Sequence, residues 1–486
     1  MLREQIKDAR LPLTGEKLAS PHLAHGTSNS FRIVRVSPPS AATQQAVGLY
    51  KADPGLIEKS YEEQKRTIFR EGAAAYSDSC AQCFSSRGHD AHEILADVKP
   101  LQESWAREHS FKFNSDNWSD EILVKQIQTI KPDVLYMQCH MRCIPKHIGR
   151  DIKRYFPSVR LVVEYTGQRL IDDHDIYTAD IMIVCTPYLE ELYRQNGIFP
   201  HIVYHGFDDQ ILRQVNANPR SNRNIPFSFV GFSGFYNGPY HCSRYWSLVE
   251  LAKRTNIQLY ITESTEERIA AFPNISLKRQ LFQLLEDHNE SQLMEILKQS
   301  GLAKDRQSAE ALELYLQECT RASKVIRGNS SIPEVEWDKT EPIIPIREAF
   351  PEHYRQGGFG KIMYETLGQS KVLFDRSTDA IATGKTVGNM RLFEATGMGC
   401  CLLAYEAENM HELFDVDSEL VTYSCMDECL EKAEYLLTHD EKRIEIASAG
   451  QAKTLSSHTT EKRFEEIEAI IKKNLVSYPP KRPPSS

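Results

Sequence analysis

The sequence lacks the long apolar runs that membrane-spanning proteins need. No window of about 18 residues is uniformly apolar, so no transmembrane helix is predicted. The first residues, Met1 to Asp8, do not have the apolar centre of a signal peptide. We therefore expect a cytoplasmic protein, for which peripheral contact with a membrane stays open.

Positive charge is also in deficit. The chain has 486 residues, with 58 Lys and Arg against 67 Asp and Glu, and its formal net charge is −9. Nucleic-acid-binding proteins usually show the opposite balance, so no nucleic-acid partner is expected. An anionic ligand would have to be met by a local cluster of positive side chains.

The 11 cysteines do not follow a regular metal-binding or disulfide spacing. Cys80 and Cys83 form a Cys-x-x-Cys pair, and Cys139 and Cys143 form a looser one. No zinc-finger spacing joins the two pairs, and a disulfide framework is not expected without a signal peptide. We interpret these residues as small buried thiols, with a zinc site as the alternative.

Cofactor motifs are absent as well. The first apolar strand, Phe31–Val36, ends at Ser37-Pro38-Pro39 and not at the glycine-rich turn of nicotinamide- or flavin-binding proteins. Asp173 with Asp175, and Asp415 with Asp417, match Asp-x-Asp, and carboxylates suit Mg²⁺ or Mn²⁺. Because both pairs fall in surface-like loops, we predict no metal site and no cofactor.

What is present is a repeated alternation of short apolar strands and helical segments, which predicts an α/β fold with parallel sheets. The length suggests two domains with additions. The predicted parts are an arm at 1–30, a first Rossmann-like domain at 31–205, a linker at 206–224, a second Rossmann-like domain at 225–455 with a helical insertion at about 263–335, a C-terminal helix at 456–474 and a disordered tail at 475–486.

Three local features stand out in the first predicted domain. Ser60 and Glu63 have the spacing of a capping box at the start of a helix that runs to about Gly72. The segment Ile144–Tyr155 is predicted to form one helix. His140 follows a strongly apolar strand at 132–138, which places it at the edge of the sheet where ligands of α/β proteins bind.

The stretch from Lys371 to Tyr405 carries the strongest functional pattern. Two apolar runs flank a helix that begins near Asn389, just beyond a predicted strand. A helix N-terminus at that position offers free N–H groups to a phosphate. Arg391 adds a guanidinium suited to phosphate, and Glu394, one turn on, can accept hydrogen bonds from sugar hydroxyls. The alternative is an ordinary buried helix on which Arg391 and Glu394 form a surface pair.

The run Asn-Met-Arg-Leu-Phe-Glu-Ala-Thr-Gly-Met-Gly at 389–399 resembles the donor-site helix of bacterial GT-B glycosyltransferases, in particular those with a spore-maturation-protein-type (CgeB-like) C-terminal domain. The resemblance continues to about Ile470. It implies two Rossmann-like domains facing across a cleft, a C-terminal helix that packs back on the first domain, and a ribose-binding role for Glu394. Many relatives carry a second glutamate where this chain has Thr386, which leaves the retaining mechanism open.

Together with these patterns, the resemblance implies a metal-independent glycosyltransferase that uses a nucleotide-diphosphate sugar, in cell-surface polysaccharide or glycoconjugate synthesis, with an unknown sugar, lipid-linked or protein acceptor. The domain at 31–205 would then be the acceptor domain, and the domain at 225–455 the nucleotide-sugar domain. The alternatives are a non-enzymatic GT-B binding or scaffold protein and a GT-B nucleotide-sugar epimerase. His140 is the predicted catalytic residue, with a structural histidine as the alternative. The predicted donor-binding residues are Arg244, His241, Tyr364, Gly388, Asn389, Met390, Arg391 and Glu394.

Overall fold

The structure is a computed structural model in which contacts divide the chain into Met1–Ser30 and Phe31–Ser486. All the helices and strands described below belong to the second unit. The predictions for the arm, the helical insertion, the end of the tail, His140, His241 and the Asp173/Asp175 pair lie outside the described residues. The structure describes residues 30–37, 41–72, 78–138, 144, 146–149, 151–167, 179–215, 223–234, 242–262, 345–376 and 386–476.

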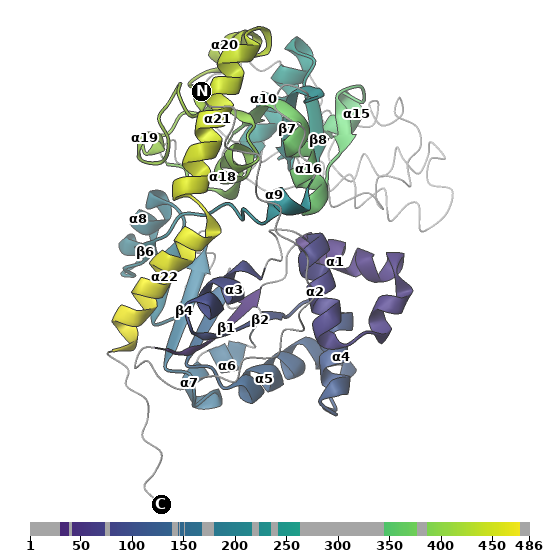
Figure 1. The fold of residues 1–486 in the computed structure, drawn as a ribbon, viewed down its shortest axis with the longest axis vertical. Coiled ribbons are helices and arrows are strands. Elements are labelled where there is room, and N and C mark those ends of the chain that lie inside the picture. Colours follow the sequence, from purple (N-terminus) through teal and green to yellow (C-terminus); the bar gives the residue numbers. More distant parts are fainter. Residues whose placement is uncertain are drawn as a thin grey trace, which may run out of the picture. The chain divides into compact units, whose positions relative to one another are not determined.

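The first sheet has six strands in the order β2-β1-β3-β4-β5-β6, and every pairing is parallel (Figure 1). The chain order reverses between β1 and β3, so the carboxyl ends of these two strands are where an α/β protein binds its ligand. The strands are β1 (Arg32–Ser37), β2 (Asp90–Leu95), β3 (Val134–Gln138), β4 (Leu161–Thr166), β5 (Ile181–Val184) and β6 (His201–Ile202).

Helices flank this sheet, and one of them begins as predicted. The amide of Ser60 donates to Glu63 Oε2 at 3.1 Å, and the amide of Glu63 donates to Ser60 Oγ at 3.3 Å, which confirms the capping box. The helices are α1 (Ala41–Ala52), η1 (Pro54–Glu58), α2 (Tyr61–Gly72), α3 (Ser79–Ser86), α4 (Lys99–Glu108), η3 (Ser115–Asn117), α5 (Trp118–Ile130), α6 (Lys146–Gly149), α7 (Ile152–Tyr155), α8 (Pro187–Gln195) and α9 (Ile211–Gln214).

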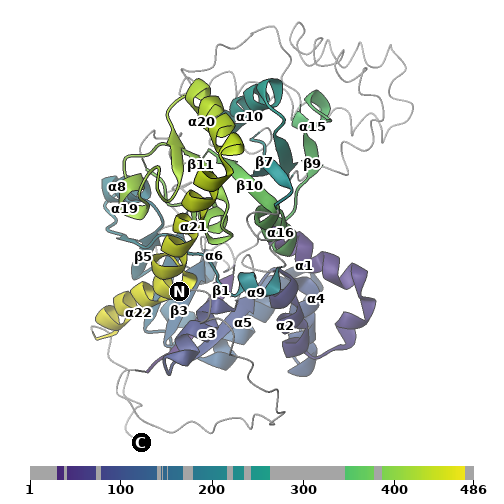
Figure 2. The same ribbon diagram turned by 45° about the horizontal axis from the view of Figure 1, so that its top comes forward.

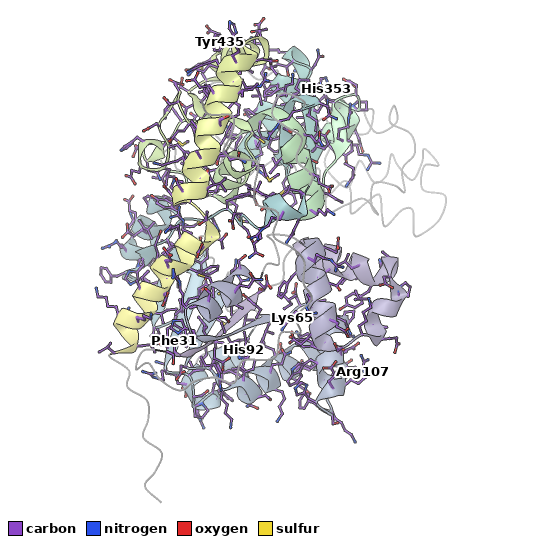
Figure 3. The ribbon with its side chains drawn as sticks, viewed as in Figure 1. Phe31, Lys65, His92, Arg107, His353 and Tyr435 are labelled. Carbon is purple, nitrogen blue, oxygen red and sulfur yellow. The ribbon has the colours of Figure 1, made fainter. Side chains whose placement is uncertain are left out.

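Two aromatic side chains hold the helical layer of this half together. Tyr61 and Trp105 belong to one buried cluster with residues of α4 and α5, so their role is packing. Lys65 lies on α2, the helix of Tyr61, and Arg107 lies on α4, the helix of Trp105 (Figure 3). Lys65 pairs with Glu62 at 2.7 Å, an interaction within one exposed helix face that contributes little to stability.

The prediction of one helix at Ile144–Tyr155 is wrong. Two short helices, α6 and α7, form instead. α6 ends at Gly149, and Asp151 has a non-helical φ of −150° before α7 begins. Glycine is a weak helix former, which makes this a favourable place for the helix to end.

The second sheet repeats the architecture with the order β12-β11-β10-β7-β8-β9, again all parallel (Figure 2). Its switch point lies between β7 and β10. The strands are β7 (Ile225–Gly231), β8 (Gln258–Ile261), β9 (Tyr354–Gln356), β10 (Ser370–Asp375), β11 (Cys401–Tyr405) and β12 (Val421–Tyr423). The helices are α10 (Cys242–Arg254), α15 (Ile346–Ala349), α16 (Lys361–Gln369), α18 (Met390–Gly397), α19 (Met410–Leu413), α20 (Met426–Thr438), α21 (Asp440–Ser457) and α22 (Thr460–Leu475).

Each sheet is buried on both faces, and single strands show it. Along β10, Val372 and Phe374 join one buried cluster while Leu373 joins the other. Along β3, Tyr136 and Leu135 likewise belong to clusters on opposite faces. Successive side chains of a strand point to opposite faces, so a strand covered on both sides has to be apolar throughout.

The C-terminal helix α22 packs on the first sheet, as the resemblance implies. Phe464, Ile467 and Ile471 lie in the same buried cluster as residues of β3 and β4. Glu468 lies 3.0 Å from His89 Nε2, which adds a polar contact to this packing. None of the described helices is long and apolar enough to cross a bilayer.

Candidate active site

The N-terminal end of α18 lies at the switch-point side of the second sheet, where the sequence predicts phosphate binding. Asn389 is the N-cap residue, with φ −70° and ψ 163°, but its side chain makes no capping hydrogen bond. Its Oδ1 atom is buried and has no hydrogen-bond partner among the described residues. The first N–H groups of α18 therefore receive no cap from the side chain of Asn389, and they are suited to an anion.

Glu394 is held from two sides. The hydroxyl of Tyr364 donates to Glu394 Oε1 at 3.0 Å, and Arg391 Nη1 lies 3.1 Å from Oε2. This contact is an ion pair without hydrogen-bond geometry, and Nη1 makes no hydrogen bond to any described residue. Burial raises the pKa of Tyr364 well above its usual range, so the phenol stays protonated and can donate. Two of the predicted donor-binding residues, Tyr364 and Arg391, thus contact a third, Glu394.

An acidic side chain that sequence reasoning missed stands beside them. Asp375 is the last residue of β10 and is 4% exposed. Burial raises its pKa, while the positive charges of Arg244 and Arg391 act in the opposite direction. Arg244 donates from Nε to the carbonyl of Arg376 at 3.1 Å. The signal for Asp375 was available, since an acid directly follows a buried apolar run at a ligand-binding edge.

Gly388 and Thr386 bring the segment before α18 against the first half of the chain. A Cβ on Gly388 would lie 2.3 Å from the carbonyl oxygen of Cys185 and 2.7 Å from Cδ1 of Tyr204, so only glycine fits. The amide of Tyr188, in the first turn of α8, donates to Thr386 Oγ1 at 3.2 Å. The hydroxyl of Thr386 therefore makes a structural contact at the position where many relatives carry a glutamate.

A hollow of about 100 Å³ lies at the carboxyl ends of the strands of the first sheet. Small-molecule sites usually have roughly 300–1,000 Å³, so this one suits the reactive end of a ligand and not a whole nucleotide-sugar. Tyr364 and Met390 reach it from the second half. Its lining is Arg35, Ser79, Tyr136, Gln138, Tyr165, Tyr204, His205, Gly206, Asp208, Tyr364, Met390, Thr460, Arg463, Phe464 and Ile467.

Polar groups of this hollow include His205 and Arg35, which the sequence did not single out. Burial, followed by the positive charge of Arg463, lowers the pKa of His205 to about 4, so its imidazole is neutral near pH 7. Tyr165 Oη lies 3.2 Å from its Nδ1. Arg35 forms a buried ion pair with Glu93 and donates to Gln138 Oε1 at 3.0 Å. A charged residue inside the apolar strand at 31–36 is the signal that could have found Arg35.

The structure thus gathers part of the predicted set. Arg391 and Tyr364 both contact Glu394, and Arg244 donates to the carbonyl of Arg376, the residue after Asp375. Met390 is 42% exposed and borders the hollow. His140 and His241 lie outside the described residues, so their placement stays a prediction.

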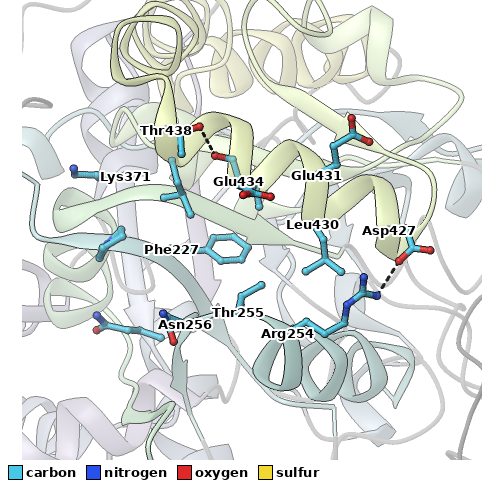
Figure 4. Close-up of a pocket in the computed structure, with 14 residues that line it drawn as sticks. Phe227, Arg254, Thr255, Asn256, Lys371, Asp427, Leu430, Glu431, Glu434 and Thr438 are labelled. Atoms are coloured by element: carbon cyan, nitrogen blue, oxygen red, sulfur yellow. Dashed lines mark hydrogen bonds and ion pairs between the residues drawn. The ribbon is translucent and has the colours of Figure 1, made fainter.

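A second hollow lies at the opposite, amino-terminal edge of the second sheet, between α20 and the end of α10 (Figure 4). Arg254 and Asp427 form an ion pair of 2.8 Å at its margin, which Figure 4 marks with a dashed line. Ligands of open α/β sheets bind beyond the carboxyl ends of the strands, so this edge is not the candidate active site.

The candidate metal ligands are the aspartate and cysteine pairs of the sequence. Within the described ranges there is no group of three or more His, Cys, Asp or Glu residues that could hold an ion. Asp415 and Asp417 are both exposed. Cys80 and Cys83 are buried free thiols, and burial raises the pKa of each.

Comparisons with known proteins agree with this fold. Residues 307–469 match a family model described as glycosyl transferase-like, which is less than half of the chain. A glycosyltransferase from Rickettsia africae has a similar structure, with 10% identity, a TM-score of 0.50 and coverage of 92% of this chain and 99% of that one. No curated protein matches the sequence.

Two further solved structures are similar over a comparable length. The Anabaena protein HepE, in complex with UDP and glucose, is 12% identical with a TM-score of 0.48, and 92% of this chain covers 100% of that chain. Sucrose-phosphate synthase from Thermosynechococcus elongatus is 8% identical with a TM-score of 0.47, over 92% and 99%. At identities this low, a structural similarity is evidence for the fold and not for an activity. The chain has the two-sheet α/β fold of GT-B glycosyltransferases.

Proposed function

We propose that this protein is a glycosyltransferase that moves a sugar from a nucleotide-diphosphate sugar to an acceptor. One observation carries the proposal. Within the segment that matches the glycosyl transferase-like model, the start of α18 combines helix N–H groups with Arg391 and Glu394 at the ligand-binding edge of the sheet.

The groups at this site suit the parts of such a donor. The diphosphate takes the N–H groups of α18 and the guanidinium of Arg391, with Arg244 and, from the resemblance, His241 nearby. The ribose hydroxyls donate to Glu394. Each carboxylate oxygen has about two acceptor positions. Among the described residues, Tyr364 uses one position on Oε1, and Arg391 lies beside Oε2 as an ion-pair partner. Glu394 can therefore accept ribose without losing its present partners.

In the proposed reaction an acceptor hydroxyl attacks the anomeric carbon, and the bond from that carbon to the diphosphate oxygen breaks. The leaving diphosphate carries the electron pair and gains negative charge. Arg391, Arg244 and the α18 N-terminus stabilise that charge in place, so we propose that no divalent metal is required. Whether the configuration is retained or inverted stays open, because Thr386 replaces the glutamate of many relatives.

The first half is proposed to contact the acceptor. The hollow beyond its strands is small and lined by tyrosines and polar groups, which suits the reactive end of a sugar acceptor. His140 is the proposed catalytic residue there, in orienting the acceptor or taking its proton. The finer assignment, a CgeB-like enzyme of cell-surface polysaccharide or glycoconjugate synthesis, rests on the resemblance at residues 389–399. The proposed cytoplasmic location rests instead on the sequence patterns at the start of the chain and on its lack of long apolar runs.

One observation favours a different class. The Thr386 hydroxyl is used in a structural contact with the Tyr188 amide, as it would be in a GT-B protein whose donor site has lost its chemistry. Such a protein would bind a nucleotide-sugar, or only a partner, without turnover. A GT-B epimerase would instead change the donor in the absence of any acceptor.

The test begins with a thermal-shift screen of UDP-, GDP- and ADP-sugars, since a ligand of the folded form raises its stability. Calorimetry then compares Glu394→Ala with Glu431→Ala, an exposed glutamate on α20. We expect the first change to weaken nucleotide binding by about tenfold or more and the second to leave it unchanged. A wild-type protein that binds no nucleotide would contradict the proposal.

Turnover assays separate the remaining alternatives. Transfer to an acceptor that continues with a chelator supports the metal-independent reaction, and loss restored by Mn²⁺ contradicts it. Binding without turnover indicates a scaffold, and donor isomerisation without acceptor indicates an epimerase. His140→Ala should lower turnover far more than nucleotide affinity, because a group that acts only in the transition state does not contribute to binding in the ground state.

A further inference from the structure

Asn409 makes an unusual pair of hydrogen bonds to the backbone just before the donor-site helix. The amide of Val387 donates to Asn409 Oδ1 at 2.8 Å, and Asn409 Nδ2 donates to the carbonyl of Val387 at 2.8 Å. Asn409 is 4% exposed and Val387 is 2% exposed. One side-chain amide thus satisfies both polar groups of a buried residue, as a neighbouring strand would.

The place of Val387 gives this contact its consequence. Val387 stands two residues before Asn389, the N-cap of α18, whose own side chain makes no cap. The direction in which the first N–H groups of α18 point therefore depends on how the chain is held at Val387. Asn409 comes from a different element, the N-cap position of α19, so it fixes α18 from outside.

The neighbours of Val387 are held by the other half of the chain. Thr386 accepts from the Tyr188 amide, and Gly388 lies against the Cys185 carbonyl and the ring of Tyr204. Asn409 Nδ2 also lies 3.4 Å from Tyr204 Oη. The segment Thr386–Gly388 is thus held on one side by α8 and the strand ends of the first half, and on the other by Asn409.

We propose that Asn409 is a positioning residue of the nucleotide-sugar site, which aims the N-terminus of α18 and Arg391 at the donor diphosphate. The inference rests on the proposed function, since it concerns the same site. Asparagine suits the task because it supplies one donor and one acceptor from the same planar group. Alanine at this position would leave a buried N–H and a buried carbonyl unpaired, and the backbone would move to satisfy them.

The test compares Asn409→Ala with Ser228→Ala. Ser228 is buried in β7 and donates to Ser370 Oγ at 2.8 Å. Replacing it by alanine therefore removes a buried hydrogen bond in the same half of the chain, but at the first residue of β10 and not at the carboxyl end where the donor site lies. Both variants are measured well below their unfolding temperatures, by calorimetry with UDP, GDP and ADP. We expect Asn409→Ala to bind the preferred nucleotide about tenfold more weakly and Ser228→Ala to bind it as the wild type does.

Hydrogen exchange measures local opening of the backbone, which can be told apart from a loss of overall stability. Amide protons at residues 387–393 should exchange faster in Asn409→Ala, and not in Ser228→Ala. If Asn409→Ala does not fold, Asn409→Ser, which puts a shorter hydroxyl group in place of the amide, takes its place, with an intermediate loss expected. Wild-type affinity in the Asn409 variant, or an equal loss in the Ser228 variant, would overturn the inference. A wild-type protein that binds none of the three nucleotides would instead overturn the proposed function.

Discussion

Tyr364 on α16 donates a hydrogen bond to Glu394 on α18 across 3.0 Å, and so joins two elements of the candidate donor site. Replacing this tyrosine by phenylalanine removes only the hydroxyl. One oxygen of a buried carboxylate then loses its donor, which we expect to cost about 1–3 kcal/mol of unfolding free energy. We also expect nucleotide affinity to fall by a few-fold, because Glu394 is less well oriented for ribose.

Urea unfolding and calorimetry on Tyr364→Phe measure the two effects. Tyr260→Phe is the matched control, since the hydroxyl of Tyr260 donates to Gln258 Oε1 at 3.0 Å on β8, away from α18. The control should lose little stability and keep nucleotide affinity. Unchanged affinity in Tyr364→Phe would mean that Arg391 alone is enough to orient Glu394.

Arg35 and Glu93 form a buried ion pair in the first sheet, with Nε 2.6 Å from Oε2 and side chains 10% and 2% exposed. Burial raises the pKa of Glu93, and Arg35 opposes that shift. Glu93→Leu would leave a buried positive charge without its partner, and we expect a loss of about 3–5 kcal/mol. The double change Arg35→Met with Glu93→Leu should recover much of it.

Denaturant unfolding of the two single variants and the double variant gives the coupling between them. The exposed pair Arg254–Asp427 is the control, with side chains 46% and 84% exposed. Removing Asp427 should change stability by about 1 kcal/mol or less. If the double variant were as unstable as Glu93→Leu, the packing of Arg35 and not its charge would be the larger contribution.

The order of strands and helices is predictable because each central strand must be apolar on both faces. The runs Val134–Met137 and Val372–Phe374 carry that requirement in three or four residues, and turn and capping residues supply the ends. Local chemistry of this kind needs no knowledge of distant residues, as the Ser60–Glu63 capping box shows.

Contacts that shape the site are a different matter, because they join distant positions. Tyr188 and Thr386 are 198 residues apart in the chain, and no periodicity indicates which element a hydroxyl will meet. The spacing of Arg391 and Glu394 does predict their contact. The pair does not lie on the surface, because these side chains are only 16% and 6% exposed, and their burial depends on what packs around them. Nothing in the sequence pointed to Asn409.

His458 lies where α21 ends and α22 begins, and its protonation state is tied to Arg463. Arg463 donates from Nη2 to His458 Nδ1 at 2.7 Å, so Nε2 carries the proton and donates to the carbonyl of Leu413 at 2.8 Å. The imidazole is therefore neutral in the folded protein. Burial, with the charge of Arg463 adding to it, lowers the pKa of His458 to about 4 from the usual 6.5.

The sign of the pH dependence follows from that shift. Between about pH 6.5 and pH 4 the unfolded chain binds a proton at this histidine and the folded chain does not, so stability falls as the pH falls through this window. A shift of this size corresponds to at most about 3 kcal/mol. Urea unfolding of wild type and His458→Gln from pH 7 to pH 4.5 measures it, with His411→Gln, an exposed histidine, as the control. Wild type and the control should lose stability more steeply than His458→Gln. Parallel curves for all three would mean that His458 accepts a proton without breaking its contact with Arg463.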